Sequence, residues 1–494
     1  MLTIRPYEFW FVTGSQHLYG NEALQEVEKH SSEITRHLNE SSNLPFKVTF
    51  KGVLTNASDI HNLILKVNSD ENCAGIITWM HTFSPAKMWI SGLKALQKPL
   101  LHLHTQYNRD IPWETIDMDF MNLNQSAHGD REYGFIGTRL NVPRKVIVGH
   151  YQNEATTTKI AEWMKTAAAV TEGKNIRVAR FGDNMRNVAV TDGDKIEAQI
   201  KFGWTVDYYG IGDLVEEIEK VSSIEVEEIY QEYKEIYELP ETSSNAGEIK
   251  DSIMEQARIE LGLKAFLSER NYNAFTTNFE DLHGMKQLPG LAAQRLMAEG
   301  YGFAGEGDWR TAALLRMMKI MANNKGTSFM EDYTYHLEPN NELILGSHML
   351  EICPTIATTK PRIVVNPLSM GGKADPARLV FDGGEGEAVV ASLIELGGRY
   401  RLVINEVIGE KSRNETPNLP VAKVLWKPMP SLTKATEAWI YAGGAHHTVF
   451  SFEVTSDQLE DFAEMTGIEC IVIDKDTNPR KLRSELKIGQ GIWG

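Results

Sequence analysis

The sequence has few cysteines and no long apolar run. Its three cysteines, Cys73, Cys353 and Cys470, are far apart in the 494-residue chain and form no CxxC pair. This odd, scattered set indicates a reducing cytoplasm. No uninterrupted apolar stretch approaches the ~20 residues that a membrane helix needs. The N-terminus, interrupted by Glu8, also lacks the apolar core of a signal peptide. We therefore expect a cytoplasmic protein with no membrane partner.

Positive charge is also scarce. Lys and Arg total 50 against 67 for Asp and Glu, which gives a formal net charge of −17, and no block of Lys or Arg interrupts this acidic excess. Nucleic acid and anionic membrane surfaces are therefore not expected partners. A chain of this length predicts about three domains and is typical of a metabolic enzyme.

The chain changes character along its length. Residues 1–170 alternate short apolar runs with amphipathic stretches, which is typical of a parallel sheet with crossover helices. After the polar break TEGKN, a second block of the same kind spans residues 171–327. Residues 328–494 are rich in short β-like segments punctuated by Gly and Pro, which favours a barrel or a sandwich. The predicted fold is α/β, with two doubly wound α/β domains followed by a C-terminal mainly-β barrel domain.

Two polar segments of the first block carry candidate substrate contacts. GSQHLYG (14–20) lies between a predicted strand and a predicted helix but lacks the spacing of GxGxxG or GxxxxGK[ST]. It is either a structural turn or a place where Gln16 and Tyr19 contact a polar substrate. NQSAHGDREYG (124–134) is predicted to be a glycine-containing loop that places His128 and Asp130 near the carboxyl ends of strands, where ligands of such sheets bind. A lone loop histidine is, however, more often a surface hydrogen-bonding residue than a catalyst.

Four residues in the latter part of the chain combine two carboxylates with two imidazoles. They are Glu306 in GFAGEGDW, Glu331 in SFMEDYTY, His348 in the β-like run LGSHMLEICP, and His447 in GGAHHTVFS. Mixed oxygen and nitrogen ligation suits Mn²⁺ or Co²⁺ and leaves two positions open on an octahedral ion. The four residues are too far apart for a compact local motif, and the zinc patterns HExxH and CxxC are absent. Neighbouring residues of a strand point to opposite faces, so we do not expect His446 and His447 to face one ligand in the same way.

Seven segments together resemble the bacterial L-arabinose isomerases. These are TGSQHLYG, NLNQSAHGDREYG, ARFGDNMRNVAVTDGDK, GFAGEGDW, SFMEDYTY, LGSHMLEICP and GGAHHTVFS, in this order between residues 13 and 451. The resemblance implies an aldose–ketose isomerase that converts L-arabinose to L-ribulose, and D-galactose to D-tagatose less readily, through a cis-enediol as the first step of arabinose catabolism. It also implies one Mn²⁺ per subunit, with Co²⁺ as a substitute. The implied assembly is a homohexamer, a dimer of trimers, with its sites at subunit interfaces.

The resemblance also implies roles for individual residues. Glu306, Glu331, His348 and His447 would be the metal ligands, with Glu306 and Glu331 also the catalytic acid and base. His446 would face away and support the strand or the ligands. The sugar would be contacted by six residues: Gln16, Tyr19, Gln125, His128, Met185 and Phe279. For Met185 and Phe279, the residue types alone favour simple core packing.

Other functions remain open at this point. An L-fucose isomerase-like enzyme shares the expected architecture and chemistry. A metal-dependent sugar aldolase would stabilise a similar enediolate and then break a C–C bond, so its products are two fragments instead of one ketose. A non-catalytic sugar-binding protein would bind sugar without turnover. The lack of a basic DNA-contacting segment and the four candidate ligands argue against this last alternative.

Overall fold

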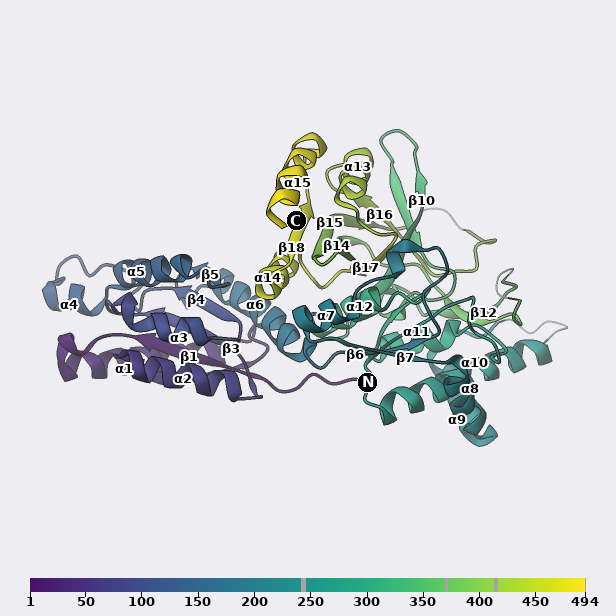
Figure 1. Cartoon of the computed structure of the whole chain (residues 1–494), viewed down its shortest axis with the longest axis horizontal. Coiled ribbons are helices and arrows are strands. Elements are labelled where there is room, and N and C mark those ends of the chain that lie inside the picture. The colour runs from purple at the N-terminus through teal and green to yellow at the C-terminus, as the bar shows by residue number, and fades with distance from the viewer. Residues whose placement is uncertain (241–245, 369–371, 413–415, 494) are drawn as a thin grey trace. The chain divides into compact units, whose positions relative to one another are not determined.

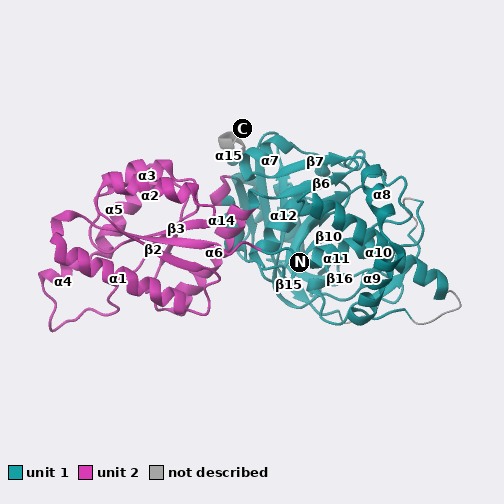
Figure 2. Cartoon of the chain, turned by 90° about the horizontal axis from the view of Figure 1, so that it is seen from below, with its two compact units in different colours: residues 1–3, 173–463, 468–494 teal, residues 4–172, 464–467 magenta. Residues whose placement is uncertain are grey.

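The computed structural model describes residues 1–240, 246–368, 372–412 and 416–493 and divides the chain into two compact units (Figures 1 and 2). Unit 1 comprises residues 1–3, 173–463 and 468–494, and unit 2 comprises residues 4–172 and 464–467. The further division of the chain at residue 327 stays a prediction.

Unit 2 contains a five-stranded parallel sheet with the strand order β2-β1-β3-β4-β5. The strands are β1 (Glu8–Gly14), β2 (Lys47–Leu54), β3 (Cys73–Met80), β4 (Leu100–His104) and β5 (Lys145–Val148). The helices are α1 (Gly20–Glu40), α2 (Ala57–Ser69), α3 (Ile90–Ala95), α4 (Met118–Leu123), α5 (Ser126–Arg139) and α6 (Glu154–Gly173).

Helices cover both faces of this sheet because its central strands are apolar on both sides. Every residue of β3 is buried. Along β1, Phe9 belongs to a core cluster that includes Trp163 of α6, whereas Trp10 belongs to a second cluster that includes Ile60 of α2. Alternation between two cores is what a doubly wound parallel sheet requires, and it explains the continuous apolar runs of the sequence.

The prediction of a loop over residues 124–134 is wrong, because most of this segment is the start of α5. Ser126, Gly129, Asp130 and Tyr133 are buried at the spacing of one helix face. Gly129 indicates close packing here instead of a turn, since a Cβ at this position would lie 2.4 Å from the carbonyl oxygen of Thr82.

Unit 1 begins with a four-stranded parallel sheet of order β7-β6-β8-β9. The strands are β6 (Arg177–Phe181), β7 (Thr205–Tyr209), β8 (Ala274–Thr277) and β9 (Gly302–Ala304). The helices are α7 (Lys195–Phe202), α8 (Ile211–Lys220), α9 (Ser223–Ile236), α10 (Ala246–Glu269), α11 (Gly290–Ala298) and α12 (Trp309–Met321).

A closed β-barrel follows in the same unit. Its strands are β10 (Thr327–His336), β11 (Leu343–Ser347), β14 (Gly386–Glu395), β15 (Tyr400–Glu410), β16 (Lys423–Pro428) and β17 (His447–Ser451). They pair antiparallel in the order β14-β17-β10-β11-β16-β15, and β15 pairs again with β14, which closes the barrel. Strand β18 (Glu469–Ile473) extends β15 in parallel, and β12 (Arg362–Val365) and β13 (Ala377–Val380) form a separate ribbon. The remaining helices are α13 (Leu432–Ala442), α14 (Ser456–Thr466) and α15 (Pro479–Trp493). Two parallel α/β sheets followed by a β-barrel confirm the predicted fold class.

Helix α12 joins the sheet of unit 1 to the barrel. It packs against β6, β8 and β9 of the sheet and against β10, β14 and β17 of the barrel. All its residues are buried, as expected for a helix with neighbours on every side. Residues at either end of this helix are therefore held between the sheet and the barrel.

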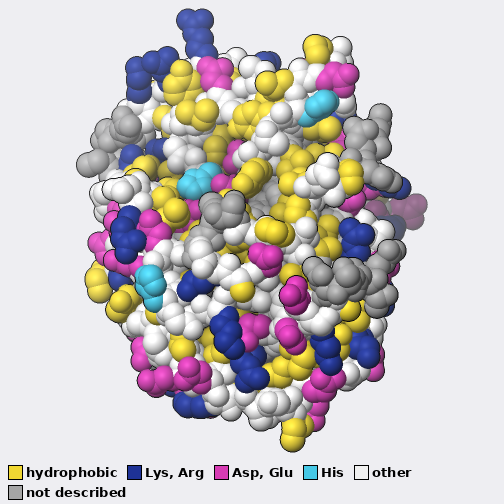
Figure 3. All heavy atoms as spheres, turned by 90° about the vertical axis from the view of Figure 1, so that its right-hand side faces the viewer, with side chains coloured by type: hydrophobic (Ala, Val, Ile, Leu, Met, Phe, Trp, Pro, Cys, Tyr) yellow, Lys and Arg dark blue, Asp and Glu magenta, His cyan; other side chains and the backbone are white. Residues whose placement is uncertain are grey.

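The surface is mixed in charge where it is drawn in Figure 3. Acidic and basic side chains are interspersed over the lower half of that face, and hydrophobic side chains gather in its upper half. Among the described residues, no helix is both long enough and apolar enough to cross a bilayer.

Candidate metal centre

The carboxyl ends of the parallel strands in unit 1 carry three loops that pack on one another. Glu306 lies in the loop between β9 and α12, where its carbonyl oxygen accepts a hydrogen bond of 2.9 Å from the N–H of Met185. The next residue, Gly307, donates to the carbonyl oxygen of Thr277 at the end of β8. Glu306 has a φ of 60°, a left-handed conformation that costs a non-glycine residue of order 1–3 kcal/mol unless its surroundings hold it. This edge of an open α/β sheet is where ligands bind.

The barrel contributes the other three predicted ligands. Glu331 of β10 pairs in register with His447 of β17, and directly opposite residues of an antiparallel pair project from the same face. Glu331 also pairs with Ser347 of β11, and His348 follows that residue. The ring centroids of His348 and His447 are 6.0 Å apart. Glu306 and His447 are 141 positions apart in the sequence (447 − 306 = 141). They and the two predicted ligands between them thus lie in one region of unit 1.

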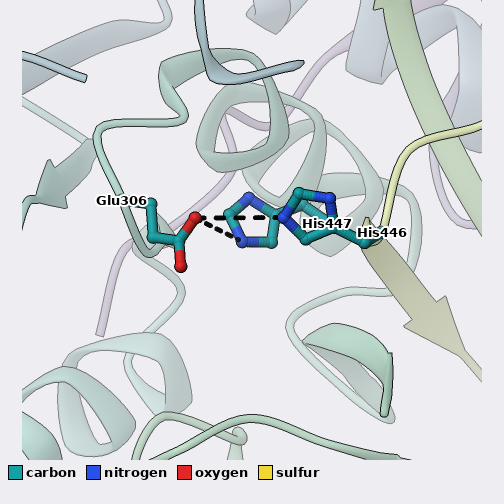
Figure 4. A group of neighbouring side chains, drawn as sticks. All are labelled: Glu306, His446 and His447. Carbon is teal, nitrogen blue, oxygen red and sulfur yellow. Dashed lines mark ion pairs between the residues drawn. The ribbon is translucent and has the colours of Figure 1, made fainter. Parts of the chain in front are cut away.

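Glu306, His446 and His447 lie close enough together to share a metal ion. One carboxylate oxygen, Oε2 of Glu306, lies 3.7 Å from Nε2 of His447 and 3.9 Å from Nε2 of His446, and Figure 4 shows both imidazoles beside this carboxylate. Each residue offers a ligand atom within 4.8 Å of the others. The expectation that His446 faces away is therefore wrong. Strand β17 begins only at His447, so the alternation of a strand does not govern the preceding residue.

The chemistry of His447 fits a bound divalent cation. Its side chain is fully buried, and Nε2 finds no hydrogen-bond partner among the described residues. Its other nitrogen, Nδ1, lies 3.1 Å from Oδ2 of the buried Asp308. A buried nitrogen without a partner is costly, whereas an imidazole that a carboxylate orients through one nitrogen commonly ligates a metal through the other.

His348 is also oriented by a carboxylate. Its Nδ1 lies 2.6 Å from Oε2 of Glu351, and both side chains are buried. Burial by itself lowers the pKa of His348, but the negative charge and hydrogen bond of Glu351 outweigh it and raise the pKa above its ordinary value. Gly305 lies beside the other edge of the ring, since a Cβ at this glycine would come within 3.3 Å of Nε2 of His348.

Asp308 and Glu351 are not among the residues predicted from the sequence. Asp308 follows Glu306 by two residues, and Glu351 follows His348 by three. A carboxylate a few residues after each candidate ligand was therefore the available signal. It was weak because acidic residues are common throughout this chain.

Two carboxyl groups of the centre, Glu306 and Asp308, have a pKa below the ordinary value. The neighbouring imidazole of His446 lowers the pKa of Glu306 most, and the charges of His447 and His348 add to this effect against partial burial. Burial raises the pKa of Asp308, but its contact with His447 outweighs burial and brings the pKa below its ordinary value. Ionised oxygen ligands beside imidazole nitrogens are suited to a first-row divalent ion.

Two of the predicted sugar contacts border this centre. Met185 is tied to the carbonyl of Glu306 as described, and the ring of Phe279 lies nearly parallel to that of His348, with centroids 6.2 Å apart. Both side chains are only partly buried. This exposure disfavours the simple core packing that their residue types suggested.

The other four predicted contacts lie together in unit 2. Gln16 precedes the short 3-10 helix His17–Tyr19 after β1, Tyr19 ends it, and Nε2 of Gln125 lies 3.4 Å from the hydroxyl of Tyr19. His128 is one turn further along α5, where its ring packs on Phe83 with centroids 4.9 Å apart. Unit 2 thus presents a polar cluster of its own at one edge of its sheet.

Comparisons with known proteins cover the whole chain. Three family models match in succession: the L-arabinose isomerase N-terminal domain over residues 3–175, the central domain over 177–324 and the C-terminal domain over 326–469. The chain is 66% identical over 493 residues to the L-arabinose isomerase of Geobacillus stearothermophilus, a match that covers 100% of this chain and 99% of the relative. It is 61% identical over 493 residues to the L-arabinose isomerase of Bacillus subtilis, with the same coverage of both chains.

The fold and these comparisons together define an aldose–ketose isomerase, an intramolecular oxidoreductase. Within that class, the chain belongs to the L-arabinose isomerase family.

Proposed function

We propose that this protein converts L-arabinose to L-ribulose and, less readily, D-galactose to D-tagatose, as the first step of arabinose catabolism in the cytoplasm. Relatives that are 61–66% identical over the full chain carry the name L-arabinose isomerase. The structural observation that supports metal dependence is the buried Nε2 of His447 beside Glu306, which has no hydrogen-bond partner in the part of the chain that the structure describes.

Glu306, Glu331, His348 and His447 would hold one Mn²⁺, or Co²⁺ in its place. When bound, the ion supplies Lewis-acid polarisation of two neighbouring sugar oxygens. Asp308 and Glu351 orient the two imidazoles through their Nδ1 atoms. His446, at 3.9 Å from Glu306, stands at the open side of the group, where a sugar hydroxyl can reach it.

Glu306 and Glu331 would carry the protons. Moving a carbonyl from C1 to C2 requires that a proton leave C2 and return to C1, with a cis-enediol between the two steps. One carboxylate that lies over both carbons performs this transfer, and the other moves the proton between the two oxygens. Met185 and Phe279 would cover the apolar face of the sugar.

The polar cluster of unit 2 would serve the site of a neighbouring subunit. In the proposed assembly, a homohexamer built as a dimer of trimers, Gln16, Tyr19, Gln125 and His128 of one chain contact the sugar at another chain's metal centre. Dilution that dissociates the assembly then abolishes turnover, which parallel activity and light-scattering measurements test.

The first experiment is ketose formation from L-arabinose by the purified protein, before and after EDTA and after Mn²⁺ is restored. A His447→Ala variant serves as the comparison. The proposal predicts turnover that EDTA abolishes, that Mn²⁺ restores and that the variant lacks. Activity that is unchanged after complete metal removal contradicts metal dependence, and two carbon fragments instead of one ketose would identify an aldolase.

A further inference from the structure

One arginine ties together two loops at the carboxyl edge of the sheet in unit 1. Residues 182–188 follow β6, and residues 278–284 follow its neighbour β8. Nη1 of Arg186 lies 3.1 Å from Oε2 of Glu280, and Nη2 lies 3.2 Å from Oδ1 of Asp281. The backbone N–H of Arg186 also donates to Oε2 of Glu280 at 2.8 Å. The first loop thus holds two consecutive carboxylates of the second.

Asp281 strengthens this tie from the other side. Its Oδ2 accepts hydrogen bonds of 3.0 Å from the backbone N–H of Asp183 and from Nδ2 of Asn278, one in each loop. Gly182 has a φ of 82°, and a Cβ there would lie 2.8 Å from the Cβ of Asp281, so the loops are already in close contact where they leave the strands. Arg186 closes the far end of this contact.

The tie lies one residue away from both apolar candidates for sugar contact. Met185 precedes Arg186, and Phe279 precedes Glu280. The backbone of Met185 is bonded to that of Glu306, and the ring of Phe279 lies beside that of His348. The distance between the side chains of Met185 and Phe279, both beside the metal centre, therefore depends on how firmly the two loops are joined.

We propose that Arg186 is a positioning residue, which fixes the separation of Met185 and Phe279 and thereby sets the size of aldose that the site accepts. This inference rests on the proposed function. A pentose and a hexose differ by one hydroxymethyl group, and a rigid pocket wall discriminates a group of that size by about 10–200-fold. If the wall is loosened, the pocket discriminates less between the two sugars. The affinity for the hexose then rises relative to the affinity for the pentose.

The global fold does not depend on this arginine. Its side chain is 66% exposed, and exposed ion pairs contribute little to the stability of a protein. Arg186→Ala is therefore expected to fold with an unchanged melting temperature and an unchanged Mn²⁺ affinity. The only structural change that we expect from Arg186→Ala is in the position of the two loops relative to each other.

The test measures binding of two reduced sugars, L-arabinitol and galactitol, to the Mn²⁺-loaded protein by calorimetry, together with kcat and KM for L-arabinose and D-galactose. In Arg186→Ala, we expect the ratio of the two polyol affinities to shift about 3–10-fold toward galactitol, within the range that one such group permits. KM for L-arabinose rises by a similar factor, while kcat changes by less than about 2-fold, because the proton-carrying groups are untouched. Arg186→Lys keeps the positive charge, so its ratio of polyol affinities should lie between the ratios of the wild type and of Arg186→Ala. An unchanged ratio in Arg186→Ala overturns the proposal.

Two controls separate positioning from a general effect. Arg270 also bridges two carboxylates, Glu217 at 3.0 Å and Glu269 at 3.5 Å, but it lies before β8. Arg270→Ala should leave the polyol ratio unchanged. In a double-mutant cycle, Glu280→Gln should add little to Arg186→Ala, because both substitutions remove the ion pair between Arg186 and Glu280. Fully additive effects overturn the proposal.

Failure of the proposed function gives a different result. If the wild-type protein isomerises neither sugar, that function is wrong, but the polyol ratio still decides the role of Arg186. If the wild-type protein neither isomerises a sugar nor binds a polyol, both proposals are overturned.

Discussion

Nδ1 of His447 lies 3.1 Å from Oδ2 of Asp308, and both side chains are buried. Asp308 also caps helix α12, since it accepts hydrogen bonds from the N–H of Thr311 at 3.1 Å and from its hydroxyl at 2.7 Å. One carboxylate thus couples the first turn of α12 to the first residue of β17. Because α12 is buried between the sheet and the barrel, the orientation of this imidazole depends on the core of unit 1.

Asp308→Asn should weaken Mn²⁺ binding while it keeps the helix cap. Loss of a carboxylate that orients a ligating histidine typically costs about 10–100-fold in metal affinity. The dissociation constant of Mn²⁺, measured by electron paramagnetic resonance, checks this. Asp194→Asn is the matched control, because Asp194 caps α7 in the same way and contacts no histidine of the centre. Equal affinities in the two variants would contradict the role of Asp308.

Glu306→Gln and Glu331→Gln should each lower kcat by at least about 10²-fold, the usual contribution of a general acid or base. The amide keeps the size of the side chain but carries no transferable proton at this position. Ketose formation is measured together with the amount of bound metal, so that loss of metal is not mistaken for loss of proton transfer. Glu338→Gln, an exposed change just beyond β10, is the control. Near-normal turnover in both variants, with metal retained, would rule out the assignment.

The affinity for Mn²⁺ should fall as the pH decreases, beginning above pH 6.5. A metal binds only the neutral imidazole, and the pKa of His348, lowered by burial but raised more strongly by Glu351, lies above its ordinary value of 6.5. Protons therefore compete for His348 already at that raised pKa. Glu351→Gln removes the charge that raises the pKa, so the loss of affinity should move to lower pH.

The measurement is the Mn²⁺ dissociation constant of both proteins from about pH 8 to about pH 5, the range in which histidines titrate. Superimposable pH profiles would show that Glu351 does not control His348. In the metal-free protein, the raised pKa of His348 affects the stability of the fold, and its contribution is greater at low pH. Protonated His348 stabilises the fold below pH 6.5, and this contribution is lost as the pH rises through the raised pKa.

Gly307→Ala should destabilise the protein by about 1–3 kcal/mol, a usual cost for a strained backbone position. Gly307 has a φ of 78°, and a Cβ there would lie 2.6 Å from the Cα of Asn184 and from the carbonyl oxygen of Asp183. Backbone atoms cannot move aside as a flexible side chain does. Gly212→Ala in α8 is the control, because its Cβ would meet nothing within 4 Å. Urea unfolding compares the two variants, and equal stability would show that the loops after β6 and β9 are not tightly packed.

Local patterns in the sequence were sufficient for the fold class. The apolar runs of β1 and β3 predicted a parallel sheet, since only a sheet covered on both faces buries such strands completely. The segment 124–134 was misread because Gly129 suggests a turn when the neighbouring Thr82 is not seen. A glycine that permits close packing and a glycine that permits a turn look the same in a sequence.

By itself, the sequence determined the residue types of the candidate centre and, through seven ordered segments, the family to which the chain belongs. It did not determine which way His446 points or which carboxylate orients His447. Those relationships join residues on different elements, such as Asp308 before α12 and His447 on β17, so they exist only after the sheet, the helix and the barrel have packed together. Local propensity acts over a few residues, whereas the geometry of this centre is set by tertiary contacts between segments more than a hundred residues apart.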